Sequence, residues 1–138
     1  MTAVLCDDDP VECSAVTDQL MRAGCGLVVQ TSSVVQLLDV VSRTMPDVLV
    51  LDLALAGIRG LDVVRDLHQA SPTCAVIVLS SFVSLREDAV AAGARALVDV
   101  RDLRELDGVL ATLTRAIELD LPRPRTQPET PERTRRRS

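Results

Sequence analysis

Acidic and hydroxyl side chains follow three of the apolar runs in this chain. They are Asp7, Asp8 and Asp9 after residues 3–6, Asp52 after residues 48–51, and Ser80 with Ser81 after residues 75–79. Carboxylates that gather in one place repel one another unless a proton or a cation relieves the repulsion. Carboxylate and backbone carbonyl oxygens are the ligands that Mg²⁺ takes in proteins, usually together with several waters. If the fold brings these residues together, they form a divalent-cation site beside Asp52.

The apolar runs alternate with segments of helical spacing, and this alternation predicts the fold. Strands are expected at residues 3–6, 27–31, 48–51, 75–79 and 96–98, and helices at 10–23, 34–41, 61–70, 84–92 and 103–119. A loop is expected at 53–60, directly after Asp52. Five strand-helix repeats with short connections are typical of a parallel sheet with helices on both faces. The carboxyl ends of such strands share one edge, where ligands bind, and the acidic and hydroxyl residues lie at that predicted edge.

Helix capping is a simpler explanation for part of this pattern. An acidic run before Pro10 is typical of a helix start, since a side-chain oxygen caps the first turn and the charges suit the helix dipole. Taken alone, this explanation is preferred for residues 7–9, and Asp9 is expected to be the cap. The conjunction with Asp52 and Ser80 favours a shared site, because all three features fall at the same edge.

The composition limits the other functions. The 138 residues most simply form one domain, which contains Phe82 as its only aromatic residue and no lysine. Binding of bases or sugars through stacked rings is therefore disfavoured, and no lysine can serve as a nucleophile or phosphate ligand. The four cysteines lack the C-x-x-C spacing of a zinc site, so free thiols are expected.

Charge is distributed unevenly along the chain. Residues 1–120 carry nine arginines against eighteen acidic residues, whereas residues 121–138 carry six arginines against two glutamates and are rich in proline. We therefore expect a folded domain at 1–120 and a disordered basic tail or linker at 121–138. Contact with an anionic partner is expected of the tail only. Since neither a membrane span nor a signal peptide is recognisable, the sequence predicts a cytoplasmic protein that does not contact membranes.

The spacing of these residues resembles the receiver domain of bacterial two-component response regulators. The resemblance covers about residues 1–118 and is carried by residues 4–10 (VLCDDDP), 46–52 (PDVLVLD) with Gly60 eight residues further on, 76–81 (VIVLSS) and 92–94 (AGA). It implies the flavodoxin-like (βα)5 fold, a three-layer α/β structure whose parallel five-stranded sheet has the order 2-1-3-4-5. It also implies a non-enzymatic signalling module that takes a phosphoryl group from a histidine kinase or phosphotransfer protein.

The resemblance assigns a role to each residue of the candidate site. Asp52 matches the phosphoacceptor, and Ser80 matches the residue whose hydroxyl hydrogen-bonds the phosphoryl group. Asp8 matches the direct Mg²⁺ ligand and Asp7 the acid that holds the metal through water. Asp52 itself and the backbone carbonyl of Ala54 match the remaining protein ligands. Phosphoryl transfer depends on positioning and charge neutralisation, both of which Mg²⁺ supplies.

Three positions depart from the family pattern. Val100 stands where family members carry a lysine, Leu97 stands where they carry Tyr or Phe, and Leu55-Ala56 replace Met-Pro. Arg101 is one position beyond the missing lysine, and strand alternation is expected to point it the other way. Two functions therefore stay open. The chain is either a receiver that still accepts phosphate, or a degenerate receiver that works without phosphorylation as a dimerisation or ligand-responsive interaction module.

The resemblance also bears on partners. Related receivers often dimerise through a face that corresponds here to residues 84–92, 96–98 and 103–119, so this face is the expected homodimer interface. DNA contact and transcription control are expected only through an output domain outside these residues, which contain no helix-turn-helix pattern.

Two other functions fit the sequence poorly. A Mg²⁺-dependent aspartyl phosphatase needs an acid where Ala54 stands. A flavodoxin-type cofactor binder needs a Ser/Thr-rich loop in place of residues 7–9, whose charge would repel a phosphate.

Overall fold

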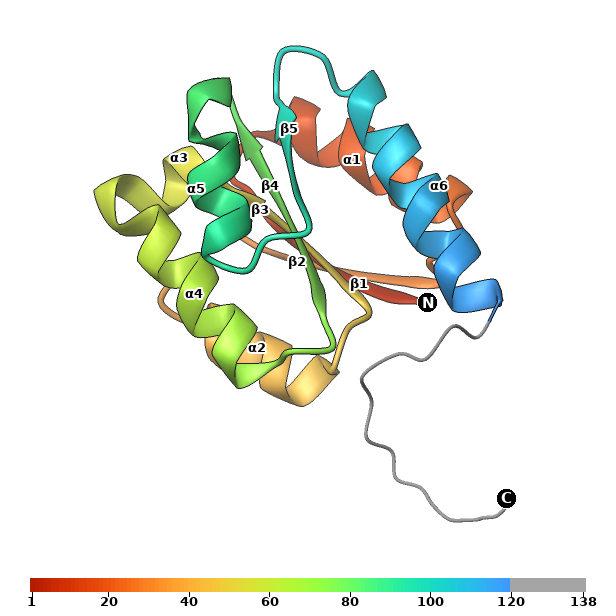
Figure 1. The fold of residues 1–138 in the computed structure, drawn as a ribbon. Coiled ribbons are helices and arrows are strands. Elements are labelled where there is room, and N and C mark those ends of the chain that lie inside the picture. Colours follow the sequence, from red (N-terminus) through yellow and green to blue (C-terminus); the bar gives the residue numbers. More distant parts are fainter. Residues whose placement is uncertain (120–138) are drawn as a thin grey trace.

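The computed structural model describes residues 1–119, so the predicted tail at 121–138 lies outside the described residues. The elements in chain order are β1 (Thr2–Cys6), α1 (Pro10–Arg22), β2 (Leu27–Thr31), α2 (Leu37–Thr44), β3 (Val48–Asp52), α3 (Leu53–Ala56), η1 (Gly57–Arg59), α4 (Gly60–Ala70), β4 (Ala75–Ser80), η2 (Val83–Leu85), α5 (Arg86–Ala91), β5 (Ala96–Asp99) and α6 (Arg104–Glu118) (Figure 1). None of the helices in this part of the chain has the length and apolarity that crossing a membrane requires.

The five strands form one parallel sheet in the order β2-β1-β3-β4-β5, which confirms the predicted flavodoxin-like α/β fold. The register aligns the strand ends. Cys6 lies opposite Leu51 on β3, and Asp52 lies opposite Leu79 on β4. The segments that follow β1, β3 and β4 therefore leave the sheet at one edge, as the sequence predicts.

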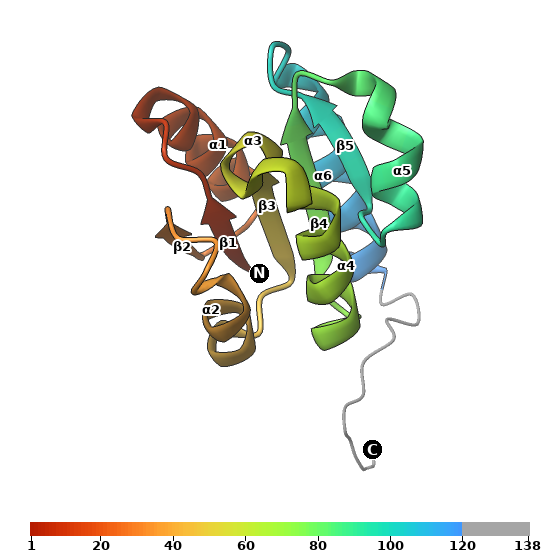
Figure 2. The same cartoon turned by 90° about the vertical axis from the view of Figure 1, so that its left-hand side faces the viewer.

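Helices cover both faces of the sheet (Figures 1 and 2). On one face, α1 and α6 pack against strand residues such as Leu5 and Ile77. On the other, α2, α4 and α5 pack against residues such as Leu49 and Val78. Both faces of a strand in this position are buried, which explains why the central strands are continuous aliphatic runs.

The second helix begins later than the sequence predicts. Helix α2 starts at Leu37 rather than at residue 34, so that predicted boundary is wrong. Hydroxyl groups hold the preceding residues in turns instead. Thr31 Oγ1 accepts from the Ser33 N–H at 3.1 Å, and Ser33 Oγ accepts from the Gln36 N–H at 3.3 Å. Such local side-chain bonds are typical of turns and of the residues before a helix.

The segment after Asp52 is also more regular than expected. Residues 53–59 form the short helices α3 and η1 where a loop was predicted, so the expected loop is wrong. Asp52 caps this helical segment, since its Oδ1 accepts from the Ala54 N–H at 3.1 Å. Leu53 is buried beneath Gly60, where an added Cβ would clash with the Leu53 side chain. The residue that follows Asp52 is therefore packed against the start of α4.

Candidate functional site

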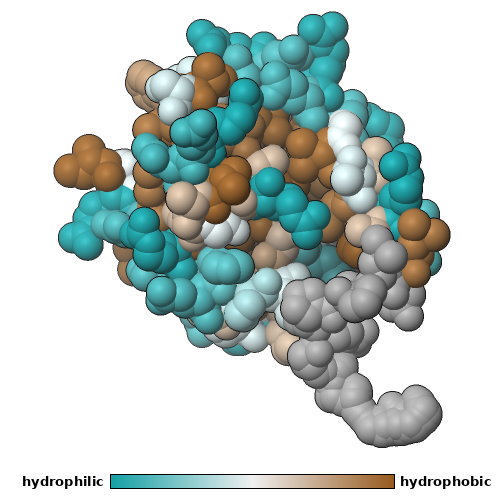
Figure 3. Space-filling view, in the orientation of Figure 1, coloured by the Kyte–Doolittle hydropathy of each residue, from teal (hydrophilic) through white to brown (hydrophobic). Residues whose placement is uncertain are grey.

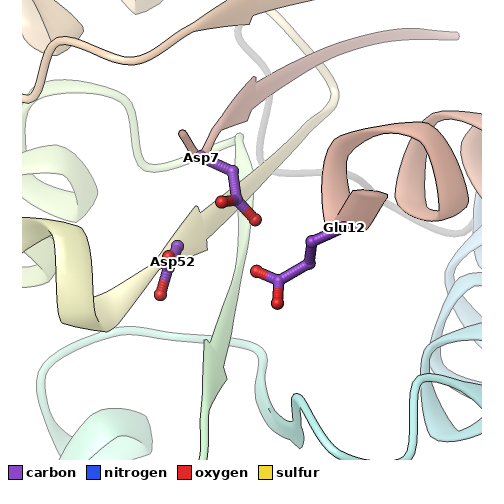
Figure 4. A group of neighbouring side chains, drawn as sticks. All are labelled: Asp7, Glu12 and Asp52. Atoms are coloured by element: carbon purple, nitrogen blue, oxygen red, sulfur yellow. The ribbon is translucent and has the colours of Figure 1, made fainter. Parts of the chain in front are cut away.

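Three carboxylates meet at the carboxyl edge of the sheet. Asp7 follows β1, Asp52 ends β3, and Glu12 projects from the first turn of α1 (Figure 4). One oxygen of each side chain lies within 4.8 Å of an oxygen of each of the others. The sequence predicts that Asp7 and Asp52 lie together, and the fold brings them together. The sequence pattern does not predict that Glu12 belongs to this group.

Asp7 is the most enclosed member of this group, with only 4% of its surface exposed. Its Oδ1 accepts from the Asp9 backbone N–H at 3.0 Å. Its Oδ2 is buried and has no hydrogen-bond partner. A buried carboxylate oxygen without a partner is costly, so this atom fits a site that a cation or a proton completes.

The Asp52 carboxylate is half-buried and surrounded mostly by negative charge. Burial raises its pKa, and the nearby charge of Asp7 raises it further. The hydrogen bond from the Ala54 N–H opposes this shift, and the charge of Asp8 adds to it. Among these effects, only the hydrogen bond from the Ala54 N–H offsets the negative charge of Asp52.

The pKa of Glu12 is raised to about 8, first by burial and then by its contact with Asp7. The charges of Asp52 and Asp9 act in the same direction. Cys6 lies beneath the group, and burial together with the charges of Asp7 and Asp52 raises the pKa of its thiol to about 11. Burial is the largest cause of each of these pKa shifts, and the negative charge gathered at this edge adds to it.

The other predicted site residues lie around the group of three. Asp8 is exposed and does not belong to that group, although its charge acts on Asp52. The Ala54 carbonyl accepts from the Gly57 N–H, which leaves one lone pair on that oxygen for another partner. Ser80 is buried at the end of β4, and its Oγ accepts from the Phe82 N–H at 3.0 Å. The Ser80 hydroxyl keeps its own proton for donation.

Of the positions that depart from the family pattern, Leu55 and Ala56 lie in α3, Leu97 lies within β5, and Val100 directly follows β5. Val100 packs against the apolar cluster beneath α1 and α6, in the place where the lysine is expected. Leu97 is 3% exposed and belongs to the cluster on the other face. Arg101 is exposed and forms an ion pair with Asp99.

The sequence does contain a pattern that draws attention to Glu12, namely its spacing from the helix cap. Asp9 caps α1, its Oδ1 accepting from the Val11 and Glu12 N–H groups at 2.9 and 3.3 Å, as predicted. A glutamate three residues after a cap is the second half of a capping box, in which it accepts from the backbone N–H of the cap. Here the Asp9 N–H donates to Asp7 instead, so the Glu12 carboxylate is left to face the acids.

Hollows on the described part of the chain include two that lie at opposite edges of the sheet. One of about 700 Å³ opens beside the acids and is lined by Asp7, Asp8 and Thr17. The other, of about 410 Å³, lies at the opposite edge, where His68 and Arg95 line it. The first hollow reaches the carboxylate group through Asp7, whereas neither Glu12 nor Asp52 lines it.

Comparisons with known proteins agree with this fold. The family model of the response regulator receiver domain matches residues 3–101. The N-terminal receiver domain of a two-component response regulator from Bacteroides fragilis is 22% identical, with a TM-score of 0.71 over 82% of this chain and 95% of that one. The receiver domain of the TMAO respiratory system response regulator TorR is 26% identical, with a TM-score of 0.70 over 84% of this chain and 98% of that one.

A third similar structure is described with a metal. It is the receiver domain of a sensor histidine kinase from Pseudomonas aeruginosa PAO1, with a magnesium ion coordinated in its active-site cleft. It is 19% identical, with a TM-score of 0.68 over 83% of this chain and 97% of that one. Since the family model spans all five strands of the sheet, this chain belongs to the response regulator receiver domain family of two-component signalling.

Proposed function

We propose that this chain accepts a phosphoryl group on Asp52 from a histidine kinase or phosphotransfer protein, in the presence of Mg²⁺. The observation that carries the proposal is the buried Asp7 Oδ2, which has no hydrogen-bond partner and belongs to the same carboxylate group as Asp52. Membership of the receiver family supports it independently.

The contacts of Asp52 suit a nucleophile. The Ala54 N–H holds Oδ1 at 3.1 Å, which fixes the carboxylate and leaves Oδ2 to attack phosphorus. A bond forms between Oδ2 and phosphorus while the bond from phosphorus to the donor imidazole nitrogen breaks. The electron pair stays on that nitrogen, which takes a proton from solvent. Such a transfer depends on positioning and charge neutralisation more than on further covalent help.

The residues of this edge fit a divalent cation, because they offer only acceptor oxygens. Asp7, Asp8 and Asp52 would supply carboxylates, and Ala54 would supply the remaining lone pair of its carbonyl. When bound, Mg²⁺ neutralises charge on the transferring phosphoryl oxygens. Exposed Asp8 belongs to this set as a proposal from the family pattern.

Ser80 is proposed to report the modification. Its hydroxyl is buried and already accepts one hydrogen bond, so its proton is free to donate to a phosphoryl oxygen. A phosphorylated carboxylate adds roughly −1.5 to −2 charge at this edge, as a phosphorylated side chain does elsewhere. Donation by Ser80 would then move the segment that begins at Phe82.

Phosphoryl transfer is tested by intact-protein mass spectrometry with acetyl phosphate, with and without Mg²⁺. We expect wild type to gain the mass of one phosphoryl group only when Mg²⁺ is present, and Asp52→Asn to gain none. Asp66→Asn is the matched control, since it makes the same chemical change at an exposed position on α4. Absence of labelling in wild type would overturn the proposal and favour a receiver that works without phosphorylation.

Output and assembly are proposed on the family pattern. We expect a cytoplasmic protein whose folded domain ends near residue 120, and which relays the signal to an output domain or a partner. Transcription control is expected only through such an output domain. The proposed homodimer face consists of α5, β5 and α6. Apolar side chains gather there (Figure 3), and Val90 on α5 is 51% exposed. Sedimentation of wild type and Val90→Glu, with and without phosphodonor, tests this interface.

A further inference from the structure

We propose that Glu12 is a further carboxylate ligand of the divalent cation, which it holds together with Asp7 and Asp52. The inference rests on the cation site of the proposed function and adds a residue to it. Glu12 comes from helix α1, whereas Asp7 and Asp52 come from the ends of strands. The cation would then have ligands from helix α1 as well as from the strand ends of the sheet.

The spacing of the three carboxylates suits a single cation. Two oxygens on opposite sides of one ion are about 4.2 Å apart around Mg²⁺ and about 4.8 Å apart around Ca²⁺, twice the metal–oxygen distance. The ligand oxygens of Asp7, Glu12 and Asp52 all lie within 4.8 Å of one another. Each pair therefore fits in one coordination shell, with a small closure for the smaller ion.

A second observation points to a ligand. Asp7 is only 4% exposed, and its Oδ2 atom has no hydrogen-bond partner. The Asp7 carboxylate points into the space that it shares with Glu12 and Asp52 (Figure 4). A cation between these side chains would satisfy the Asp7 Oδ2 atom and relieve the repulsion between them. A purely hydrophobic role for Glu12 would leave the oxygen without a partner.

The structural roles that usually occupy such a glutamate are filled by other groups. The backbone N–H of Asp9, the usual partner of a glutamate at this position, donates to Asp7 Oδ1 at 3.0 Å. Within residues 1–119, none of the ion pairs involves Asp7, Glu12 or Asp52. The side-chain charge that the family lysine would bring is absent, because the chain contains no lysine. A bound cation would supply the positive charge that these side chains lack.

Metal binding by purified protein tests the inference without any phosphoryl transfer. The chain has no Trp or Tyr whose fluorescence could report binding. Binding of Mn²⁺ is therefore measured from the EPR signal of the free ion, and binding of Mg²⁺ and Ca²⁺ from their competition with Mn²⁺. We expect Glu12→Gln to weaken cation binding by roughly tenfold or more, because the number of ligand charges sets affinity in such sites. Glu87→Gln on α5 is the matched control and keeps wild-type affinity, since Glu87 is exposed and lies outside the carboxylate group.

Glu12→Asp separates direct ligation from a general effect of charge. It keeps the carboxylate but shortens the side chain by one methylene, so a direct ligand loses its reach while the local field is retained. We expect Glu12→Asp to bind cations weakly, as Glu12→Gln does. Wild-type affinity in either variant would overturn the inference. Thermal unfolding in EDTA confirms that both variants are folded.

The two proposals fail in different ways. If wild type binds the cation, Asp52→Asn weakens binding and Glu12→Gln does not, then the role of Glu12 is wrong and the cation site stands. If wild type binds no divalent cation, the metal site of the proposed function is wrong, and the role of Glu12 is wrong with it.

Discussion

Asp99 holds the side chain of Arg101 through two parallel hydrogen bonds. Arg101 Nε lies 3.0 Å from Asp99 Oδ1, and Nη2 lies 3.1 Å from Oδ2. The Arg101 backbone N–H also donates to Oδ1 at 2.9 Å. The hydrogen-bonded guanidinium lowers the pKa of Asp99, and the same bonds raise the pKa of Arg101. Arg101, the basic residue nearest in sequence to the position of the family lysine, is therefore paired with Asp99 at the end of β5.

This pairing predicts that Arg101 does not replace the family lysine. We expect Arg101→Ala to accept phosphate from acetyl phosphate at a rate within about twofold of wild type, since an interaction absent from the transition state costs nothing when removed. The rate is read from intact-protein mass spectra over time. A loss of about tenfold or more would show that Arg101 leaves Asp99 to bind the phosphoryl group.

Restoring the lysine should strengthen phosphoryl transfer. Val100 lies half-buried at the family lysine position, and Val100→Lys places an ammonium group there. We expect labelling of Asp52 to become roughly tenfold faster or more, because charge compensation at a developing phosphoryl anion is among the larger catalytic effects. Val100→Met is the matched control, with similar length and no charge. Equal labelling rates in Val100→Lys and Val100→Met would show that a positive charge at this position does not speed phosphoryl transfer.

The sequence predicts the sheet well because its central strands are unambiguous. Val48 to Leu51 are fully buried on β3, and such a continuous aliphatic run has few alternatives to a central parallel strand. The strand ends then bring Asp7 and Asp52 together without further information. These parts of the fold and site follow from local pattern and topology.

Glu12 illustrates what the sequence could not provide. The direction in which the Glu12 side chain points depends on where the Asp9 N–H donates. The acceptor is Glu12 in a capping box, and it is Asp7 in the structure. Both choices fit the same residues and spacing. The helix after Asp52 is a similar case, since a single bond to the Ala54 N–H turns the expected loop into α3. Such choices between neighbouring backbone donors are made by three-dimensional packing.

Removing the Asp7 charge should stabilise the protein when no metal is present. Asp7→Asn keeps an acceptor for the Asp9 N–H and adds an amide that can donate to Glu12 or Asp52. We expect the free energy of unfolding in EDTA to rise by about 1–2 kcal/mol, because repulsion between buried like charges is relieved. Urea unfolding measures this change.

The same variant should lose its response to metal. Wild type should gain stability with Mg²⁺, because a cation that binds only the folded state stabilises it, whereas Asp7→Asn should gain little. Asp66→Asn, at an exposed position on α4, should behave as wild type in both conditions. Lower stability of Asp7→Asn in EDTA would contradict the repulsion on which the argument depends.

The stability of the metal-free protein should fall as the pH rises from about 5 to 8. The pKa of Glu12 is raised to about 8 in the folded protein, from its ordinary value of 4.5. Between these values the folded state keeps a proton that the unfolded chain releases, so the contribution is complete at low pH and is lost through pH 8. The half-buried Asp52 carboxylate, whose pKa is also raised, acts in the same direction. Thermal unfolding midpoints in EDTA across this range measure the slope.

Two variants assign that slope to its source. Glu12→Gln cannot titrate, so we expect its unfolding midpoint to change less with pH than that of wild type. Glu87→Gln removes the same kind of group from an exposed position on α5 and should keep the wild-type slope. Since a cation binds the ionised carboxylates, saturating Mg²⁺ should reduce the slope in wild type. A wild-type slope in Glu12→Gln would mean that the proton is held elsewhere in the carboxylate group, with Asp52 the first residue to test.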